Sequence, residues 1–502
     1  MEADIETPKL NEMVHSLSSG FNYDFKETAI ILAAGHGKRI KSQRSKMLHK
    51  IWEIPTVERV YNACIKGIEN INCIIVVGIK AKDVMQVIGK KDNTLFVLQE
   101  EQNGTGHAVQ VALNIMDPLR FNGIIYILPG DMGLINKETI SMFRQEFINS
   151  KYDMMVLTGI YKGDPAMNNY GRIIRVKEKD AKGKFSDLDF GKVIEIIEYK
   201  DILNLDEYNP YVLKYNGRTY FYTREELLNN NEFNSGVYAF NSKILFNLIN
   251  RLTTNNVQKE IYITDLISLF NLNGYSVGAV SPKEQHVLMG FNNKSVLREM
   301  EGVARFLAYE KLKDVIEILD PEDFFIEESV IEEILDMDKK GIPLDIEIGK
   351  GVYIGKGAKL NYNLKLRKNV FLDGNILFGK NVTIWENAHI SCFPNQTLTI
   401  GNNVEILWGN IIKGNILIGD NSRIESSVNI TGSDEFPLKI GNSVLIKGKS
   451  YIFGSIIEND IFIEHCVLIK KKVERKIQSD GSVQPIKYYL PMPEGIDSVK
   501  QL

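Results

Sequence analysis

The chain has 502 residues, of which 44% are hydrophobic and 25% charged, and its formal net charge is −4. This length predicts two domains, and the apolar fraction is large enough for buried cores. The slightly acidic balance argues against bulk binding of nucleic acid or of an anionic membrane, and no apolar run approaches the ~18 residues of a membrane span. The four cysteines lie far apart, which excludes a Cys-x-x-Cys metal site and a disulfide framework and fits a cytoplasmic protein.

Residues 1–26 hold no apolar segment of signal-peptide type and are expected to form a short N-terminal extension, helical or disordered. Apolar runs typical of buried parallel strands follow at residues 28–34, 73–79, 124–128 and 154–160. Between them, apolar side chains at helical spacing predict helices, the first of them after Pro55. This alternation predicts a doubly wound, Rossmann-like α/β domain over residues 27–298, with its ligand beyond the carboxyl ends of the strands.

The first apolar run ends in a glycine-rich loop. Gly35 and Gly37 are followed by the cations Lys38, Arg39 and Lys46. Glycines permit a tight turn and let backbone N–H groups approach a ligand closely. Such amides beside Lys and Arg form a cradle suited to a triphosphate. Glycine patterns this short also occur in ordinary turns from strand to helix.

Two further motifs place polar groups near the same edge of the predicted sheet. Residues 99–108 read QEEQNGTGHA. Amide side chains both donate and accept hydrogen bonds, as a uracil edge requires, although a Gly-Thr-Gly turn by itself is more often a helix cap. The motif Leu128-Pro-Gly-Asp131 ends a buried strand with a carboxylate. Such an aspartate either binds Mg²⁺ through oxygen or is a solvated turn residue.

The second half of the chain repeats with a step of six residues. Aliphatic or aromatic side chains recur six apart in the series 348, 354, 360; 378, 384, 390; 400, 406, 412; 418, 424, 430; 440, 446, 452; and 457, 463, 469. A hexapeptide period predicts a parallel β-helix, in which stacked coils bury the recurring side chains. We expect this domain over residues 346–470, a helical arm and linker over 299–345, and a C-terminal tail over 471–502.

In this order, the motifs resemble those of bacterial N-acetylglucosamine-1-phosphate uridylyltransferases, which belong to the sugar nucleotidyltransferase superfamily. The stretch LAAGHGKRIKSQRSKMLH is similar to the nucleotide loop of that family, and QEEQNGTGHA is similar to its base-contacting segment. Further similar motifs lie at residues 169–172, 193–200, 232–236, 258–265 and 290–293. The resemblance covers both halves of the chain, because the family carries a left-handed β-helix after its nucleotidyltransferase domain.

The resemblance implies an enzyme that needs Mg²⁺ as cofactor. It would transfer UMP from UTP to N-acetylglucosamine-1-phosphate, giving UDP-N-acetylglucosamine (a cell-wall precursor) and pyrophosphate. It would act as a homotrimer joined through the β-helix. The implied residues are Arg39 and Lys46 for catalysis; Leu32, Ala33, Ala34, Gly35, Gly37, Gln99, Gln102, Gly104 and Thr105 for the nucleotide; Gly171, Glu198 and Asn234 for the sugar; and Asp131 and Asn292 for the metal.

The sequence departs from the family pattern in the nucleotidyltransferase half. Ser45 stands where the family has a proline, so the approach to Lys46 is less constrained. The spacing between Glu198 and Asn234 is longer than usual, and we interpret residues 205–230 as an extra loop or lid beside the sugar site. This insertion leaves another sugar-1-phosphate open as the substrate.

The β-helix half lacks the acetyltransferase motifs of bifunctional family members. Neither His389 nor His465 has the sequence context of the catalytic histidine of that activity. We therefore expect no acetyltransferase activity, and a role for the β-helix in oligomerisation or regulation. A third interpretation is a catalytically silent regulatory or assembly subunit. The presence of the full cation and metal set argues against it.

Overall fold

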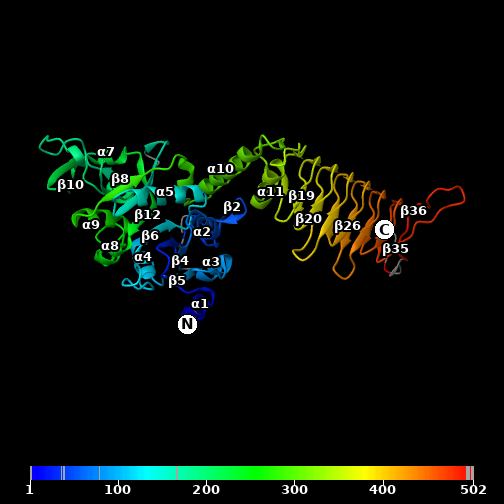
Figure 1. The fold of residues 1–502 in the computed structure, drawn as a ribbon, viewed down its shortest axis with the longest axis horizontal. Coiled ribbons are helices and arrows are strands. Elements are labelled where there is room, and N and C mark those ends of the chain that lie inside the picture. The colour runs from blue at the N-terminus through cyan, green and yellow to red at the C-terminus, as the bar shows by residue number, and fades with distance from the viewer. Residues whose placement is uncertain are drawn as a thin grey trace. The chain divides into compact units, whose positions relative to one another are not determined.

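The computed structural model describes residues 3–35, 37, 40–78, 80–165, 168–492 and 498, and the side chains from residue 9 onward. The chain divides into two compact units, Met1–Glu301 and Gly302–Leu502 (Figure 1). Helix α10 (Lys294–Leu312) runs through the boundary in the sequence. Among the described residues, no helix is long and apolar enough to cross a membrane.

The first unit is built on a mixed sheet in which one strand runs antiparallel to its neighbours. The main strands follow the order β13-β7-β12-β6-β1-β4-β5. Their bounds are β1 (Glu27–Leu32), β4 (Ile71–Val77), β5 (Thr94–Leu98), β6 (Ile124–Pro129), β7 (Met154–Ile160), β12 (Glu232–Asn241) and β13 (Val277–Val280). Strand β12 is antiparallel to both of its neighbours, β6 and β7. The predicted doubly wound α/β sheet is confirmed.

Helices cover both faces of this sheet because successive side chains of its strands point to opposite faces. In β1, Ala29 and Ile31 pack into one core, whereas Ile30 packs into the other. The first core is covered by α1 (Ala3–Leu17), α2 (Thr56–Gly67), α3 (Ala81–Ile88) and α5 (Lys137–Asn149). The second is covered by α4 (Thr105–Leu113), α8 (Ser242–Leu248) and α9 (Leu266–Leu272).

The N-terminal extension shields the free edge of the sheet. Leu10, Met13 and Val14 of α1 pack against the first core. The segment after the helix then pairs with edge strand β5, where the N–H of Phe96 donates to Oγ of Ser18 at 2.9 Å. An unpaired strand edge is a template for aggregation, and this extension covers it.

The insertion after Glu198 forms a small subdomain with its own core. Its elements and the strands that support it are β8 (Arg172–Arg175), β9 (Val193–Ile197), α6 (Tyr199–Leu203), β10 (Tyr211–Tyr215), β11 (Arg218–Tyr222) and α7 (Arg224–Leu228). The hairpin β10–β11 buries Tyr220 and Tyr222 against Ile174 and Ile194 of the supporting strands. The hydroxyl of Tyr222 donates to the carbonyl of Arg175 at 2.8 Å. The insertion is therefore packed onto β8 and β9.

The second unit is a stack of short parallel strands in three sheets (Figure 1, yellow to red). The first sheet holds β14 (Glu317–Ile318), β16 (Glu347–Ile348), β18 (Leu364–Leu366), β21 (Val382–Ile384), β24 (Glu405–Ile406), β27 (Arg423–Ile424), β30 (Leu445–Lys447), β33 (Phe462–Glu464) and β36 (Ile486–Lys487). The second holds β15 (Phe324–Ile326), β17 (Val352–Ile354), β19 (Phe371–Asp373), β22 (His389–Ser391), β25 (Ile411–Gly414), β28 (Asn429–Gly432), β31 (Tyr451–Phe453) and β34 (Val467–Ile469). The third holds β20 (Ile376–Phe378), β23 (Leu398–Ile400), β26 (Ile416–Ile418), β29 (Leu438–Ile440), β32 (Ile456–Ile457) and β35 (Lys472–Val473). The predicted left-handed β-helix is confirmed.

The stack extends beyond residues 346–470 at both ends. Strands β14 and β15 belong to a first coil that the six-residue step does not reveal, because helix α11 (Glu328–Asp338) interrupts it. The predicted inward residues are buried up to Ile463, but Ile469 is 43% exposed. Leu468 takes the inward place, opposite Ile452, because the last turn is one residue shorter.

Asparagines hold one corner of the β-helix. Asn363, Asn381, Asn403 and Asn421 have φ between 54° and 60°, the left-handed region that asparagine tolerates better than most residues. Each of the first three donates from Nδ2 to Oδ1 of the next, at 2.9 to 3.0 Å. This ladder explains why polar asparagine recurs in a domain held by aliphatic packing.

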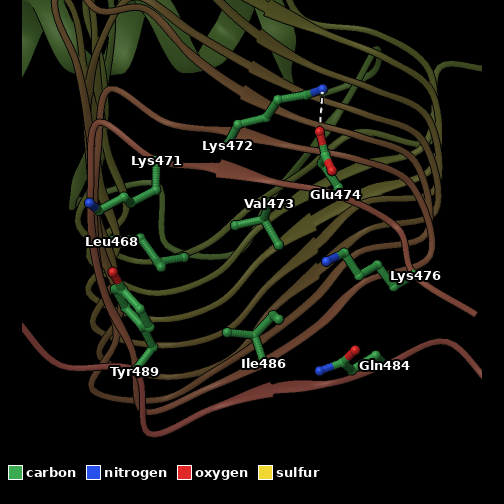
Figure 2. Close-up of a pocket in the computed structure, with 9 residues that line it drawn as sticks. All are labelled: Leu468, Lys471, Lys472, Val473, Glu474, Lys476, Gln484, Ile486 and Tyr489. Atoms are coloured by element: carbon green, nitrogen blue, oxygen red, sulfur yellow. Dashed lines mark hydrogen bonds and ion pairs between the residues drawn. The ribbon is translucent and has the colours of Figure 1, made fainter. Parts of the chain in front are cut away.

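The last coil closes around a small hollow of about 310 Å³ (Figure 2). Leu468, Val473 and Ile486 come from the three sheets and point toward one another inside the coil. Lys472 lies at the rim, where its ammonium donates to the Glu474 carboxylate at 2.9 Å. The chain departs from the helical path between β35 and β36, and the hollow marks this end of the aliphatic core.

Replacement of Asn403 tests the corner ladder. Asn403→Ala places alanine in the left-handed region, where an L residue without the local hydrogen bonding of asparagine costs ~1–2 kcal/mol. The substitution also breaks two hydrogen bonds of the ladder. Asn403→Gly breaks the same bonds but adopts this φ freely. We expect both variants to lower the free energy of unfolding of the second unit, Ala more than Gly. Denaturant titration in a Trp52→Phe background measures these free energies, because the remaining tryptophans all lie in the second unit. Equal stability of Asn403→Ala and wild type would contradict the role of the ladder.

Candidate functional site

A hollow of about 360 Å³ lies at the carboxyl ends of β1 and β6. The start of α4 and the middle of β12 form further parts of its wall. Ten of the residues singled out in the sequence line it: Leu32, Ala34, Gly35, Gln99, Gln102, Gly104, Thr105, Asp131, Glu198 and Asn234. These residues are spread over more than 200 positions of the chain, so the fold brings them together around one space.

Three polar side chains meet at one edge of this hollow. The ammonium of Lys46 forms an ion pair with the carboxylate of Asp131 and donates to Oδ1 of Asn292 at 2.9 Å. The side chains of Lys46 and Asp131 are only 11% and 14% exposed. The ring centroid of Phe291 lies 5.4 Å from the same ammonium, which adds a cation–π contact.

The donor set at this edge fits Mg²⁺. A single ammonium reaches oxygens of Asp131 and Asn292, so the two oxygens are close enough to share one cation. Mg²⁺ prefers oxygen ligands and is commonly held by one or two protein groups, with water and phosphate oxygens completing its shell. No cluster of three His, Cys, Asp or Glu occurs in the part of the chain that the structure describes, so a fully protein-bound metal has no such site there.

The glycine loop lies next to Lys46. Gly37 has φ +61°, and a Cβ there would lie 2.8 Å from Cβ of Lys46, so only glycine fits without displacement. Ala33 is buried beneath the loop, with its N–H donating to the carbonyl of Val76 at 2.8 Å, and does not line the hollow. Arg39, the proposed catalytic arginine, lies outside the described residues.

Two glutamines and a glycine form the opposite end of the hollow. Nε2 of Gln102 donates to the carbonyl of Ala34 at 2.5 Å, and Nε2 of Gln99 donates to the carbonyl of Gly104 at 3.2 Å. Gly104 has φ +107°, and a Cβ there would lie 2.5 Å from the carbonyl oxygen of Ile261. These contacts engage the amide nitrogens, and Oε1 of neither glutamine accepts a hydrogen bond from a described residue.

Gly171, Glu198 and Asn234 lie together on the β8–β9–β12 side. The N–H of Asn234 donates to the carbonyl of Gly171 at 2.9 Å, and a Cβ on Gly171 would lie 3.2 Å from Oε1 of Glu198. Asn234 also donates from Nδ2 to the hydroxyl of Tyr238 at 2.7 Å. The three residues therefore form one contact group.

Carboxyl groups in and beside this contact group have raised pKa values. Burial raises the pKa of Glu198 to about 7, Asp201 and Asp265 add to the effect, and Arg172 opposes it. Burial likewise raises the pKa of Asp265 to about 6. Arg172 is fully buried and donates to the carbonyls of Tyr170 and Asn168, which fixes the loop that carries Gly171.

The insertion of residues 205–230 does not form a lid over the hollow, since none of its residues lines it. It reaches the site only indirectly. The hydroxyl of Tyr211 lies 3.1 Å from both carboxylate oxygens of Glu195, three residues before Glu198. Burial raises the pKa of Glu195 to about 7, and the Tyr211 hydrogen bond partly offsets this.

The segment of residues 258–265 contributes more to the hollow than its sequence indicated. Glu260, Ile263 and Thr264 line the wall, and the N–H of Ile263 donates to Oγ1 of Thr105 at 3.3 Å. Oγ1 of Thr264 is buried and has no hydrogen-bond partner, so its hydroxyl is available to a ligand. The sequence singled this segment out as site-supporting, but no periodicity distinguishes Thr264 from its neighbours.

Comparison with known proteins identifies the class of this unit. Residues 29–177 match the MobA-like NTP transferase domain, which agrees with the sheet of the first unit and gives this unit the nucleotidyltransferase fold. The chain is similar in sequence to members of the sugar nucleotidyltransferase family. It is 31% identical over 307 residues to the bifunctional protein GlmU of Acetivibrio thermocellus, covering 60% of this chain and 57% of that protein.

A second GlmU protein, from Streptococcus pyogenes serotype M12, is 31% identical over 303 residues, which cover 60% of this chain and 63% of that protein. The chain thus spans less than two thirds of the length of these curated relatives. The solved structure of the inositol-1-phosphate CTP transferase from T. maritima is 12% identical, with a TM-score of 0.37, over 56% of this chain and 96% of that one.

The raised pKa of Glu195 predicts a pH-dependent stability difference. Between pH 4.5 and about 7 the unfolded chain loses the Glu195 proton before the folded chain does, so the ionised group destabilises the fold increasingly as pH rises. Glu195→Gln removes this titration and keeps an acceptor for Tyr211. We expect its advantage over wild type to grow across this window, by up to ~3 kcal/mol, and then to level off.

Denaturant titrations at pH 5 and pH 8 test this prediction, with Trp52 as the only tryptophan so that the signal reports the first unit. Glu178→Gln, at an exposed glutamate, serves as the control and is expected to show no such trend. A pH-independent difference for Glu195→Gln would contradict the assignment.

Proposed function

We propose that the first unit catalyses Mg²⁺-dependent transfer of UMP from UTP to N-acetylglucosamine-1-phosphate, giving UDP-N-acetylglucosamine and pyrophosphate. The observation that carries this proposal is the meeting of Lys46, Asp131 and Asn292 at the edge of the hollow. The similarity to GlmU proteins supports the same reaction class.

The glutamine end of the hollow suits a uracil base. Uracil presents one N–H between two carbonyl oxygens, so an amide oxygen paired with backbone N–H groups matches its edge. Because Gln99 and Gln102 use their amide nitrogens on the protein, their Oε1 atoms are available to accept from that N–H. Thr105, at the start of α4, lies beside this position.

The other end of the hollow suits a sugar with several hydroxyl groups. Glu198 and Asn234 line one wall and offer it a carboxyl and an amide side chain, whereas Gly171 does not line the hollow and accepts from the N–H of Asn234. The high pKa of Glu198 lets this carboxyl donate as well as accept near neutral pH. These features support a hexosamine phosphate without excluding another hexose phosphate.

The reaction needs positioning and charge stabilisation more than acid–base catalysis. A phosphate oxygen of the sugar phosphate attacks the α-phosphorus in line, the bond to the β-phosphate oxygen breaks, and pyrophosphate leaves with that bond's electrons. The nucleophile is already an anion, so no general base is required. Lys46 would bind the α-phosphate, and Arg39 with the loop amides would hold the leaving phosphates. Mg²⁺ bound by Asp131 and Asn292 would supply further charge neutralisation.

The second unit is proposed to join copies of the chain into a homotrimer and to lack acetyltransferase activity. On its second sheet, outward rings of Phe325, Tyr353, Phe371 and His389 stack with centroids 4.5 to 4.8 Å apart. The same outward column continues at Ile411, which is 41% exposed, passes through the polar Asn429 and reaches Tyr451, which is 37% exposed. An apolar column of this kind supports an interface.

An assay of pyrophosphate release decides the central proposal. We expect release with UTP, Mg²⁺ and N-acetylglucosamine-1-phosphate together, and only background when any one is omitted. A panel of other sugar phosphates and of ATP, CTP, GTP and dTTP separates this activity from a uridylyltransferase for another sugar. Absence of turnover with every pair would favour the silent-subunit interpretation.

Substitutions at the cation cluster test the assigned roles. Arg39→Ala and Lys46→Ala each remove a cation that would stabilise the transferring phosphates, and Asp131→Ala removes a carboxylate that would hold Mg²⁺. Each variant is expected to lower kcat by ~10²–10³. Lys243→Ala, at an exposed lysine of α8, is the matched control and should keep full activity. Unchanged thermal unfolding would show that the loss is chemical; near-normal kcat in any of the three would refute its role.

The expected lack of acetyltransferase activity is tested with the same protein. Incubation with acetyl-CoA and glucosamine-1-phosphate should release no coenzyme A above the rate without enzyme. A bifunctional GlmU protein provides the positive control. Measurable acetyl transfer would show that the β-helix carries a catalytic site with residues unlike those of the family motif.

A further inference from the structure

The first unit contains a second hollow, distinct from the one beside Lys46, Asp131 and Asn292. It measures about 440 Å³ and is lined from one side by the segment around β2 (Lys50–Ile51) and β3 (Ile54–Pro55), and from the other by the first two turns of α10. His49, Lys50 and Glu53 contribute the first side. Lys294, Leu297, Arg298 and Glu301 contribute the second, at positions i, i+3, i+4 and i+7 that share one helix face.

The two carboxylates of this hollow are already engaged. Glu53 accepts a hydrogen bond from the ammonium of Lys50 at 2.7 Å. Glu301 accepts from the backbone N–H of Trp52 at 2.8 Å. Neither Lys294 nor Arg298 forms an ion pair with any residue that the structure describes. Because Lys50 and Glu53 pair with each other, these two cations face the single carboxylate of Glu301, and the hollow keeps a net positive charge.

Two observations show that this positive charge is unfavourable as it stands. Lys294 and Arg298 are like charges at i and i+4 on a helix, an arrangement that destabilises the helix. The pKa of His49 is lowered by burial and further by the charges of Arg44 and Lys294. Nε2 of His49 is also buried without a hydrogen-bond partner. A bound anion would relieve the charge repulsion and offer that nitrogen an acceptor.

We propose that this hollow binds a small phosphate-type oxyanion, held by Lys294 and Arg298 with His49 at its base. Arg298 presents a planar set of N–H donors that matches phosphate oxygens in pairs, and Lys294 adds a point charge. The chain is acidic overall, so a local surplus of cations is not a general property of its surface.

Phe291 lies between the proposed anion site and the ammonium of Lys46. The ring of Phe291 lies edge-on to His49, with centroids 5.9 Å apart, and its face lies near the ammonium of Lys46. Lys294 follows Asn292 by two residues. The two hollows have no lining residue in common. Binding is therefore expected whether or not the proposed transferase activity is found.

Calorimetric titration of the full chain with inorganic phosphate, at ionic strength held constant with NaCl, tests the proposal. We expect saturable binding, and a Kd raised at least tenfold in the double variant Lys294→Ala/Arg298→Ala. The charge-conserving double variant Lys294→Arg/Arg298→Lys should bind within a fewfold of wild type. A parallel titration with phenyl phosphate shows whether free phosphate or a phosphoryl group on a larger molecule fits better, and tight binding of either supports the site.

Two control variants show where phosphate binds. Lys46→Ala removes a cation of the nucleotide hollow and should leave the phosphate affinity unchanged. If Lys46→Ala loses phosphate binding and Lys294→Ala/Arg298→Ala retains it, the ion binds in the nucleotide hollow and the proposal is overturned. Lys243→Ala should also leave affinity unchanged, and equal weakening by it would reveal only diffuse attraction. Absence of saturable binding in wild type would likewise overturn the proposal. Both alanine positions are exposed, and the thermal unfolding midpoint verifies that the double variant is folded.

Discussion

The ammonium of Lys46 links two segments that are far apart in the chain at the edge of the hollow in the first unit. It contacts Asp131, at the end of β6, and Asn292, which lies 246 residues away in the sequence and just before α10. Placing a cation in a half-buried position is costly unless opposite charge and hydrogen bonds surround it. Here a carboxylate, an amide oxygen and an aromatic face surround it. The same group of oxygens can accept a divalent cation, so the arrangement is suited to exchanging one cation for another when phosphates arrive.

Electrostatic conditions differ between the two ends of this hollow. At the edge beside Lys46, the positive charge of its ammonium and the amides of the glycine loop favour anions. At the wall formed by Glu198, the charges of Asp201 and Asp265 add to the effect of burial and raise the pKa of Glu198, and Asp201 also raises the pKa of Asp265. Buried Arg172 limits this effect by donating to the loop backbone beside Glu198. A ligand with a phosphate at one end and hydroxyl groups at the other would match this polarity, whereas a ligand with anionic groups at both ends would not.

The sequence predicted what depends on local pattern, and it did so for particular physical reasons. Buried parallel strands read as apolar runs, so β4, β6 and β7 were found within a few residues of their bounds. Residues that follow parallel strands must meet at one edge of the sheet, which is why Asp131 and the glycine loop could be expected to be neighbours. Thr264 could not be found this way, because its position depends on contacts between Ile263 and Thr105, far apart in the chain.

Other predictions were wrong where the structure depends on the length of one turn or on side-chain packing. The one-residue shortening before Leu468 turns Ile469 outward, and nothing in composition marks that step. The insertion of residues 205–230 was expected beside the sugar. Its alternating tyrosines in fact build a separate core on β8 and β9, which only packing reveals.

The β-helix places different demands on its inward and outward positions. Its stability comes from stacked inward aliphatics and from corner residues that tolerate the left-handed conformation, such as Asn381 and Asn403. Outward residues contribute little to the stack and can change without loss of fold. A solenoid can therefore keep its architecture while an activity on its surface is absent, and likeness of fold is a poor guide to chemistry in this unit. In the first unit the opposite holds, because the residues that line the hollow, including Gly35, Gly104 and Asp131, are also those that would contact the ligand.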